Sequence, residues 1–169
     1  MKPRFPRLIS ALTLSVGTVM FFSVHNAPAQ NQERLNNTMI EACAQSETRK
    51  GNRILECIGR FSKPCRARED NASPVMQEEC LEHEFVLWDQ HLRKQVKSLK
   101  SAIPAGEAHE HFKTSHDIWV KFRQAECRLP YILLPQGFTP KQLGLDCAIR
   151  LTARRVADIQ SLKRILQKK

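Results

Sequence analysis

The sequence predicts an all-α protein, a small antiparallel helical bundle stabilised by disulfides. Two long segments, residues 74–103 and 140–169, repeat apolar residues every three or four positions, which is the period of one helix face. No stretch shows the alternation of apolar and polar residues that is typical of strands. The chain also holds six cysteines behind a segment that resembles an export signal. An even number of cysteines in an exported chain favours a disulfide framework.

Residues 1–29 have the pattern of a secretory signal peptide. Three basic residues precede an apolar stretch at 8–24, and Ala27-Pro28-Ala29 supplies the small residues of a cleavage site. An uncleaved N-terminal membrane anchor is the alternative, although the apolar stretch is short for a span. We expect removal of the signal and a single domain at 30–169, in the periplasm or secreted, with no membrane-spanning segment.

Each element of the bundle is predicted from its own signals. Residues 30–46 carry a weak helical pattern, and 50–60 suggest a second short helix before a charged loop at 66–72. The helix at 74–103 begins with Ser73 as N-cap and Pro74 at the first helical position, and Pro104 ends it.

The second half of the chain continues the same pattern. A helix is predicted at 107–129 and a loop at 130–138. The last helix follows Thr139, which can cap it, with Gln142 placed to complete a capping box. Short connections between long helices favour antiparallel neighbours.

The six cysteines allow fifteen pairings, of which we favour one. Cys57 and Cys65 lie eight positions apart across a proline turn and could close a local loop. Cys127 and Cys147 would join two consecutive helices. Cys43 and Cys80 would then form the third bridge and tie the N-terminal segment to the first long helix.

Two arginines are predicted at apolar helix faces. Arg155 falls within the apolar sector of the last helix, and Arg123 borders the face that carries Trp119. A buried guanidinium needs a carboxylate or carbonyl partner, and Asp89 beside the apolar stripe at 74–103 is the natural candidate. We expect an ion pair that fixes helix register; a ligand site is the alternative.

Positive charge is concentrated in the last helix. The chain has 27 Lys and Arg against 17 Asp and Glu, and residues 139–169 alone hold 8 basic and 2 acidic residues. On a helical wheel four of these basic residues share the side opposite the apolar face: Arg150, Arg154, Arg164 and Lys168. They form a candidate anion-binding surface for envelope lipid or polymer, and a solvated helix face is the alternative. Nucleic acid is not expected, because no aromatic residues accompany them for base stacking.

No catalytic, metal or cofactor site is predicted, so we expect a protein that is not an enzyme. His109, His111 and His116 cluster, but the first two would point to opposite sides of a helix and no standard ligand spacing is completed. The motifs of zinc peptidases, serine hydrolases and phosphate-binding loops are absent.

Three spaced groups of residues carry a family resemblance. These are Cys80-x8-Asp89-x2-Leu92 with Trp88, then Trp119-x2-Phe122-Arg123-x3-Cys127, then Cys147-x3-Leu151-Thr152-x2-Arg155. With them the chain, from about residue 57 to 162, resembles the family of small exported proteins that includes the lysozyme inhibitor LprI. The resemblance implies an all-helical periplasmic domain with disulfides and, less directly, inhibition of lysozyme.

Two hypotheses of function follow. The first is a non-catalytic protein that blocks a lysozyme-like glycosidase, whose cleft commonly holds two carboxyl groups. A protruding loop would fill the cleft and offer a cation to those carboxylates, and the candidate loops are 66–72 and 130–138. The second is an envelope-associated protein that binds anionic lipid or cell-wall polymer through the basic residues of the last helix.

Overall fold

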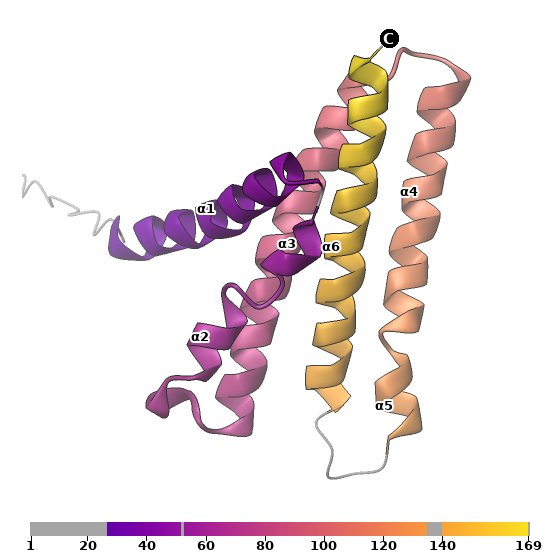
Figure 1. Cartoon of the computed structure of the whole chain (residues 1–169). Helices are drawn as coiled ribbons and strands as arrows, with labels where there is room; N and C mark the ends of the chain where they lie inside the picture. The colour runs from indigo at the N-terminus through magenta and orange to yellow at the C-terminus, as the bar shows by residue number, and fades with distance from the viewer. Residues whose placement is uncertain (1–26, 52, 135–139, 169) are drawn as a thin grey trace, which may run out of the picture.

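The computed structural model shows an all-helical chain (Figure 1). It describes residues 27–51, 53–134 and 140–168, with side chains from residue 38 onward. Within these ranges there is no strand. The elements are α1 (Ala27–Arg49), the 3-10 turn η1 (Ile54–Cys57), α2 (Ser62–Arg66), the 3-10 turn η2 (Glu69–Asn71), α3 (Pro74–Ala102), α4 (Glu107–Glu126), α5 (Leu129–Leu133) and α6 (Pro140–Gln167).

Three long helices form the body of the molecule. In Figure 1, α3 and α6 run in the same direction, and α4 runs opposite to both. The pairing of α3 with α6 is the most extensive contact between elements, and α4 packs more lightly against this pair. The predicted antiparallel arrangement therefore holds between consecutive long helices, while the main core interface joins two parallel ones.

The core lies mainly where α1, η1, α3 and α6 meet. Trp88, Leu92 and Leu99 of α3 are buried against Ile149 and Val156 of α6 in one cluster. Ile40 and Ile54 add the N-terminal elements to that cluster and are completely buried. The α1 helix projects sideways from the body in Figure 1, and Ile40 and Ala44 in its C-terminal part belong to the core cluster.

Helix starts follow local chemistry where the sequence predicted them. The Ser73 hydroxyl accepts a hydrogen bond from the Met76 N–H at 3.3 Å, and Pro74 occupies the first helical position of α3. The α3 helix ends at Ala102, before Pro104. The predicted cap at Thr139 lies outside the described residues.

A short helix replaces part of the loop predicted at 130–138. Residues Leu129–Leu133 form α5, which packs against α6. This close approach depends on Gly144, because a Cβ there would lie 2.6 Å from the Tyr131 ring and 2.9 Å from the Cys127 carbonyl oxygen. Positions 135–139 of the predicted loop lie outside the described residues.

The path between α1 and α3 differs from the prediction. A tight turn follows α1 and contains Gly51 at φ +106°, after which η1 folds back onto α1 instead of forming a helix over 50–60. Gly59 at φ +85° makes a second turn into α2, which packs on α3. Both glycines adopt backbone conformations that other residues rarely adopt.

This path changes two of the three predicted disulfides. Cys43 is bonded to Cys57 and Cys65 to Cys80, so the predicted bridges Cys57–Cys65 and Cys43–Cys80 are wrong. The reason is that η1 places Cys57 against α1, whereas α2 places Cys65 against α3. The bridge from Cys127 to Cys147 forms as predicted.

The predicted signal peptide falls mostly on residues 1–26, outside the described residues, and its removal stays a prediction. Its cleavage site, Ala27-Pro28-Ala29, coincides with the start of α1. Among the described residues, no helix is both long enough and apolar enough to cross a membrane.

Candidate functional site: a bridged basic segment beside the helical core

A buried polar cluster joins the three long helices at one point. Arg123 of α4 donates through Nη1 to Oδ1 of Asp89 on α3 and to Oγ1 of Thr152 on α6, both at 2.8 Å. Its side chain is 10% exposed, and its guanidinium carbon lies 5.1 Å from the ring centres of both Phe85 and Trp119. Because a charge so enclosed is costly without partners, this cluster favours one alignment of the helices. The expected ion pair is therefore a structural contact.

Asp89 was also the candidate partner of Arg155, but Arg155 lies beside Trp119 and Ser115 of α4. Its guanidinium carbon is 5.6 Å from the Trp119 ring centre, and its Nη2 donates to the Ser115 hydroxyl at 3.4 Å. Burial lowers the pKa of its guanidinium. Asp89 pairs with Arg123 instead, so the extension of the prediction to Arg155 is wrong.

The remaining residues of the family pattern differ in burial. Trp88 and Leu92 are buried in the core, whereas Leu151 is only half-buried. Phe122 is 50% exposed on α4, so this position is not a core position here.

Glu84 is a fully buried carboxylate on α3 that holds the turn before α2. Its Oε1 accepts the Gly59 N–H at 2.6 Å and the Trp88 indole N–H at 3.3 Å, and its Oε2 accepts the Ser62 N–H at 2.7 Å. Hydrogen bonds from three N–H groups compensate the lost hydration of the carboxylate. The turn is thereby attached to the centre of α3.

Disulfides hold the same stretch near both of its ends. Cys57 is bonded to Cys43 on α1, and Cys65 is bonded to Cys80 on α3. We call residues 57–66 the bridged segment. Its backbone is connected to two different helices by covalent bonds and to α3 also through Glu84.

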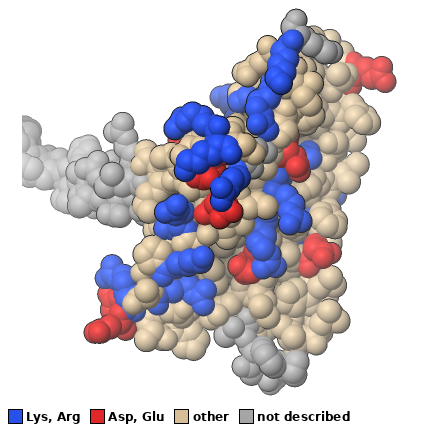
Figure 2. Space-filling view, in the orientation of Figure 1, with Lys and Arg blue, Asp and Glu red and all other residues tan. Residues whose placement is uncertain are grey.

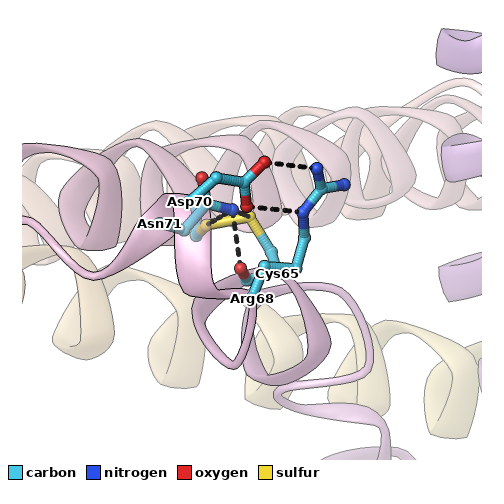
Figure 3. A network of polar contacts seen from close by, with 5 residues as sticks. Cys65, Arg68, Asp70 and Asn71 are labelled. Atoms are coloured by element: carbon cyan, nitrogen blue, oxygen red, sulfur yellow. Dashed lines mark hydrogen bonds and ion pairs between the residues drawn. A yellow bond between two sulfur atoms is a disulfide. The ribbon is translucent and has the colours of Figure 1, made fainter.

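The chain beyond the bridged segment is closed by polar contacts (Figure 3). Asn71 donates through Nδ2 to the Cys65 carbonyl oxygen at 2.7 Å and lies against the disulfide to Cys80. Arg68 donates to Asp70 through Nε at 2.9 Å and Nη2 at 2.6 Å. This pairing raises the pKa of Arg68 and lowers the pKa of Asp70. One of the two cations in the predicted loop at 66–72, Arg68, is therefore already compensated within the chain.

Three other basic side chains of this region lack such a partner. Arg60, Lys63 and Arg66 are exposed, and within the described ranges none of them forms an ion pair. Arg66 donates through Nε to the Gln77 side-chain oxygen at 2.6 Å, a neutral partner. In Figure 2, Lys and Arg side chains gather over the region where Figure 1 places α2.

A pocket of about 530 Å³ lies beside the bridged segment. Phe61 and His83 stack in its wall with ring centres 4.4 Å apart. The side chains that line it include two arginines and no acidic residue: Met39, Arg60, Phe61, Pro64, Cys65, Arg68, Asn71 and His83. A pocket with apolar walls and a basic rim suits a ligand group that is partly apolar and carries a carboxylate.

The predicted anion-binding residues of α6 are all exposed: Arg150, Arg154, Arg164 and Lys168. They form the basic face of α6. Arg150 pairs with Asp146 one turn earlier, and Arg164 donates to the Ser161 hydroxyl at 3.0 Å. Anion binding by this face stays a prediction.

Apolar side chains are exposed on the outer face of α4 and on α5. Ile118 of α4 and Leu133 of α5 are 61% and 72% exposed. A second pocket, of about 360 Å³, lies between α5 and α6 beside the bridge at Cys147. This end of the molecule includes the start of the loop that was predicted to fill a cleft.

The histidine cluster does not come together. His109 lies beside Glu110, with Nδ1 and Oε1 3.2 Å apart, whereas His116 stacks on Phe112 and Trp119. In the part of the chain that is described, no group of three or more His, Cys, Asp or Glu side chains could hold a metal ion.

The model of the lysozyme inhibitor LprI family matches residues 65–159. The chain belongs to this family. The LprI match covers α3, α4, α5 and most of α6, and therefore includes Asp89, Arg123 and Thr152. It begins at Cys65, so α1, η1 and most of the bridged segment precede the LprI region. No curated protein and no solved structure matches the chain significantly.

Two buried polar residues of α3 were missed by the sequence reasoning. Glu84 lies three positions after Leu81 and four before Trp88, within the apolar stripe, and that position could have identified it as buried. His91 follows Trp88 by three positions and is also buried. The backbone partners of Glu84, at Gly59 and Ser62, come from an irregular turn more than 20 residues away, which no periodic pattern indicates.

Proposed function

We propose that the protein is exported, acts without catalysis of its own, and inhibits lysozyme-like glycosidases by binding them. Membership of the lysozyme inhibitor LprI family carries this proposal. The matched region includes the cluster around Arg123 that aligns the three long helices, so the scaffold that the proposal needs is in place.

The cysteines support both export and the lack of catalysis. All six are bonded in pairs, as expected in an oxidising compartment, and none remains as a thiol nucleophile. Localisation in the periplasm or outside the cell follows from the signal pattern at 1–29 and from this chemistry.

An inhibition assay tests the proposed function. The full chain is expressed with its own signal, purified in oxidised form and added to lysozymes of different structural classes during digestion of peptidoglycan. We expect saturable inhibition of at least one class at or below micromolar concentration, and loss of inhibition after reduction of the disulfides. If no class is inhibited by the oxidised protein at micromolar concentration, the proposal is wrong.

The net charge indicates which lysozymes to include. The chain without residues 1–29 has 24 basic and 17 acidic residues, and many lysozymes are themselves basic. Like charges slow encounter at low salt, although complementary contacts can override this effect once the surfaces meet. The panel should therefore include neutral or acidic lysozymes and be assayed at two salt concentrations.

The basic face of α6 supports a second candidate function, binding of anionic lipid or polymer. Its four side chains are exposed along one side of a single helix. Vesicles with and without phosphatidylglycerol test this function against a variant in which all four residues become Gln. Binding that is independent of salt, or equal for the variant, would exclude it.

A further inference from the structure

We propose that the bridged segment is the surface that contacts an acidic protein partner, through Arg60, Lys63 and Arg66. The partner chemistry is the carboxylate-bearing cleft of a lysozyme-like glycosidase, so this inference rests on the proposed function. It differs from the sequence hypothesis, in which loops 66–72 and 130–138 were the candidates to fill the cleft, although Arg66 belongs both to the bridged segment and to the first of those loops.

Backbone restraint is the first argument for this surface. Disulfides at Cys57 and Cys65 attach the segment to α1 and α3, and the Glu84 carboxylate holds the N–H groups of Gly59 and Ser62 between them. An element fixed before binding loses little conformational freedom when it binds. Such restraint suits a contact surface.

Positive charge without an ion-pair partner is the second argument. Neighbouring basic residues are paired within the chain: Arg68 with Asp70, and Lys50 with Glu47 at 2.9 Å. Arg60, Lys63 and Arg66 form no ion pair within the described ranges, although all three lie on one short stretch. Three adjacent cations with exposed side chains are complementary to a surface that concentrates carboxylates.

The adjacent pocket supplies the third argument. Arg60 lines it together with the apolar residues Phe61 and Pro64. Guanidinium groups bind carboxylates through paired hydrogen bonds, and apolar contact next to such a pair excludes water from it. The pocket therefore allows the partner to bury a side chain beside the ion pairs.

Most of the bridged segment lies before the LprI match, and we assign it a role in specificity for this reason. The match begins at Cys65, so Arg60 and Lys63 precede it. These side chains are contacts that the bridged segment adds to the LprI region, and they would select which glycosidase the chain binds.

Matched charge removal tests the inference. The first variant carries Arg60→Gln, Lys63→Gln and Arg66→Gln, and the control carries Lys97→Gln, Lys100→Gln and Lys113→Gln at exposed positions of α3 and α4. Both lose three positive charges, so long-range electrostatic effects are similar. Inhibition constants are measured against the lysozyme that the unaltered chain inhibits best, after circular dichroism has shown that each variant is folded.

We expect the bridged-segment variant to lose affinity at least tenfold and the control to stay within about threefold. Equal affinity of the two variants, or a greater loss in the control, overturns the inference while the proposed function stands. Failure of the unaltered chain to inhibit any lysozyme overturns both. If the triple variant does not fold, Arg60→Gln alone replaces it, with Lys113→Gln as control and an expected loss of at least threefold.

Discussion

Glu84 shows how much one buried polar residue contributes to the arrangement of the N-terminal elements. Replacement by Gln removes the charge and places an NH2 group among N–H donors, so at least one donor loses its acceptor. We expect Glu84→Gln to lower the free energy of unfolding by about 3 kcal/mol. Denaturant titration of the oxidised protein measures this change. Glu79→Gln on the exposed side of α3 is the control, and a similar loss in both variants would contradict the assignment.

A substitution at Arg123 tests the polar cluster around it in the same way. Lys in its place cannot bridge Asp89 and Thr152 in the same geometry and loses the planar contacts with aromatic rings. We expect Arg123→Lys to destabilise the fold by about 2–4 kcal/mol. The control is Arg93→Lys, because Arg93 pairs with the same Asp89 at 2.9 Å but is exposed, and its loss should stay below about 0.5 kcal/mol. Similar losses of unfolding free energy in the two variants would show that the cluster stabilises the fold no more than an exposed ion pair does.

His91 makes stability depend on pH. Its ring is buried with no hydrogen-bond partner for either nitrogen among the described residues. Burial lowers the pKa of the imidazole; Glu41 on α1 opposes this shift, whereas Lys94 on α3 and Lys163 on α6 add to it. The unfolded chain therefore binds a proton at higher pH than the folded chain does.

The sign of the effect follows from proton linkage. The free energy of unfolding is highest while His91 is neutral in both states, above the unfolded pKa of about 6.5. It decreases as the pH falls below this value, because the unfolded chain then binds the proton more readily. Burial lowers the pKa of His116 as well, and acts in the same direction. We expect the urea midpoint to fall between pH 7.5 and pH 5, and His91→Leu to reduce that fall. An unchanged pH dependence in the variant would contradict the role of His91.

At the scale of elements, the disulfides determine how α1 and α2 are attached. Non-reducing peptide mapping should recover Cys43 linked to Cys57 and Cys65 linked to Cys80. A Cys43→Ser/Cys57→Ser variant opens a loop of 14 residues, and we expect it to lose about 3 kcal/mol of stability. Peptides that join Cys57 to Cys65 would instead support the pairing expected from sequence.

The long helices were predictable because their signals are local. The apolar stripe of α3, its cap at Ser73 and the bridge between Cys127 and Cys147 each depend on residues close in sequence or on consecutive helices. The path from α1 to α2 was not predictable, since two glycines with positive φ and the distant Glu84 carboxylate determine it. The same limit applied to the candidate site, because that path brings Arg60 to the wall of a pocket with Phe61 and Pro64.

At the scale of the whole molecule, two groups of exposed basic residues are candidates for contact with an acidic partner. One is the basic face of α6, where Arg150 is partly compensated by Asp146. The other is the bridged segment, whose cations form no ion pair within the described ranges and whose backbone is held by two disulfides. We therefore assign the contact with an acidic partner to the bridged segment.

The central claim is that the oxidised protein occupies the cleft of a lysozyme-like glycosidase. Calorimetric titration of the full chain, exported and oxidised, into such an enzyme tests it most directly, with and without a saturating N-acetylglucosamine oligomer in the cleft. The account predicts one-to-one binding at micromolar affinity or tighter, weakened in the presence of the oligomer. Absence of binding to every lysozyme class, or binding that the oligomer leaves unchanged, would contradict it.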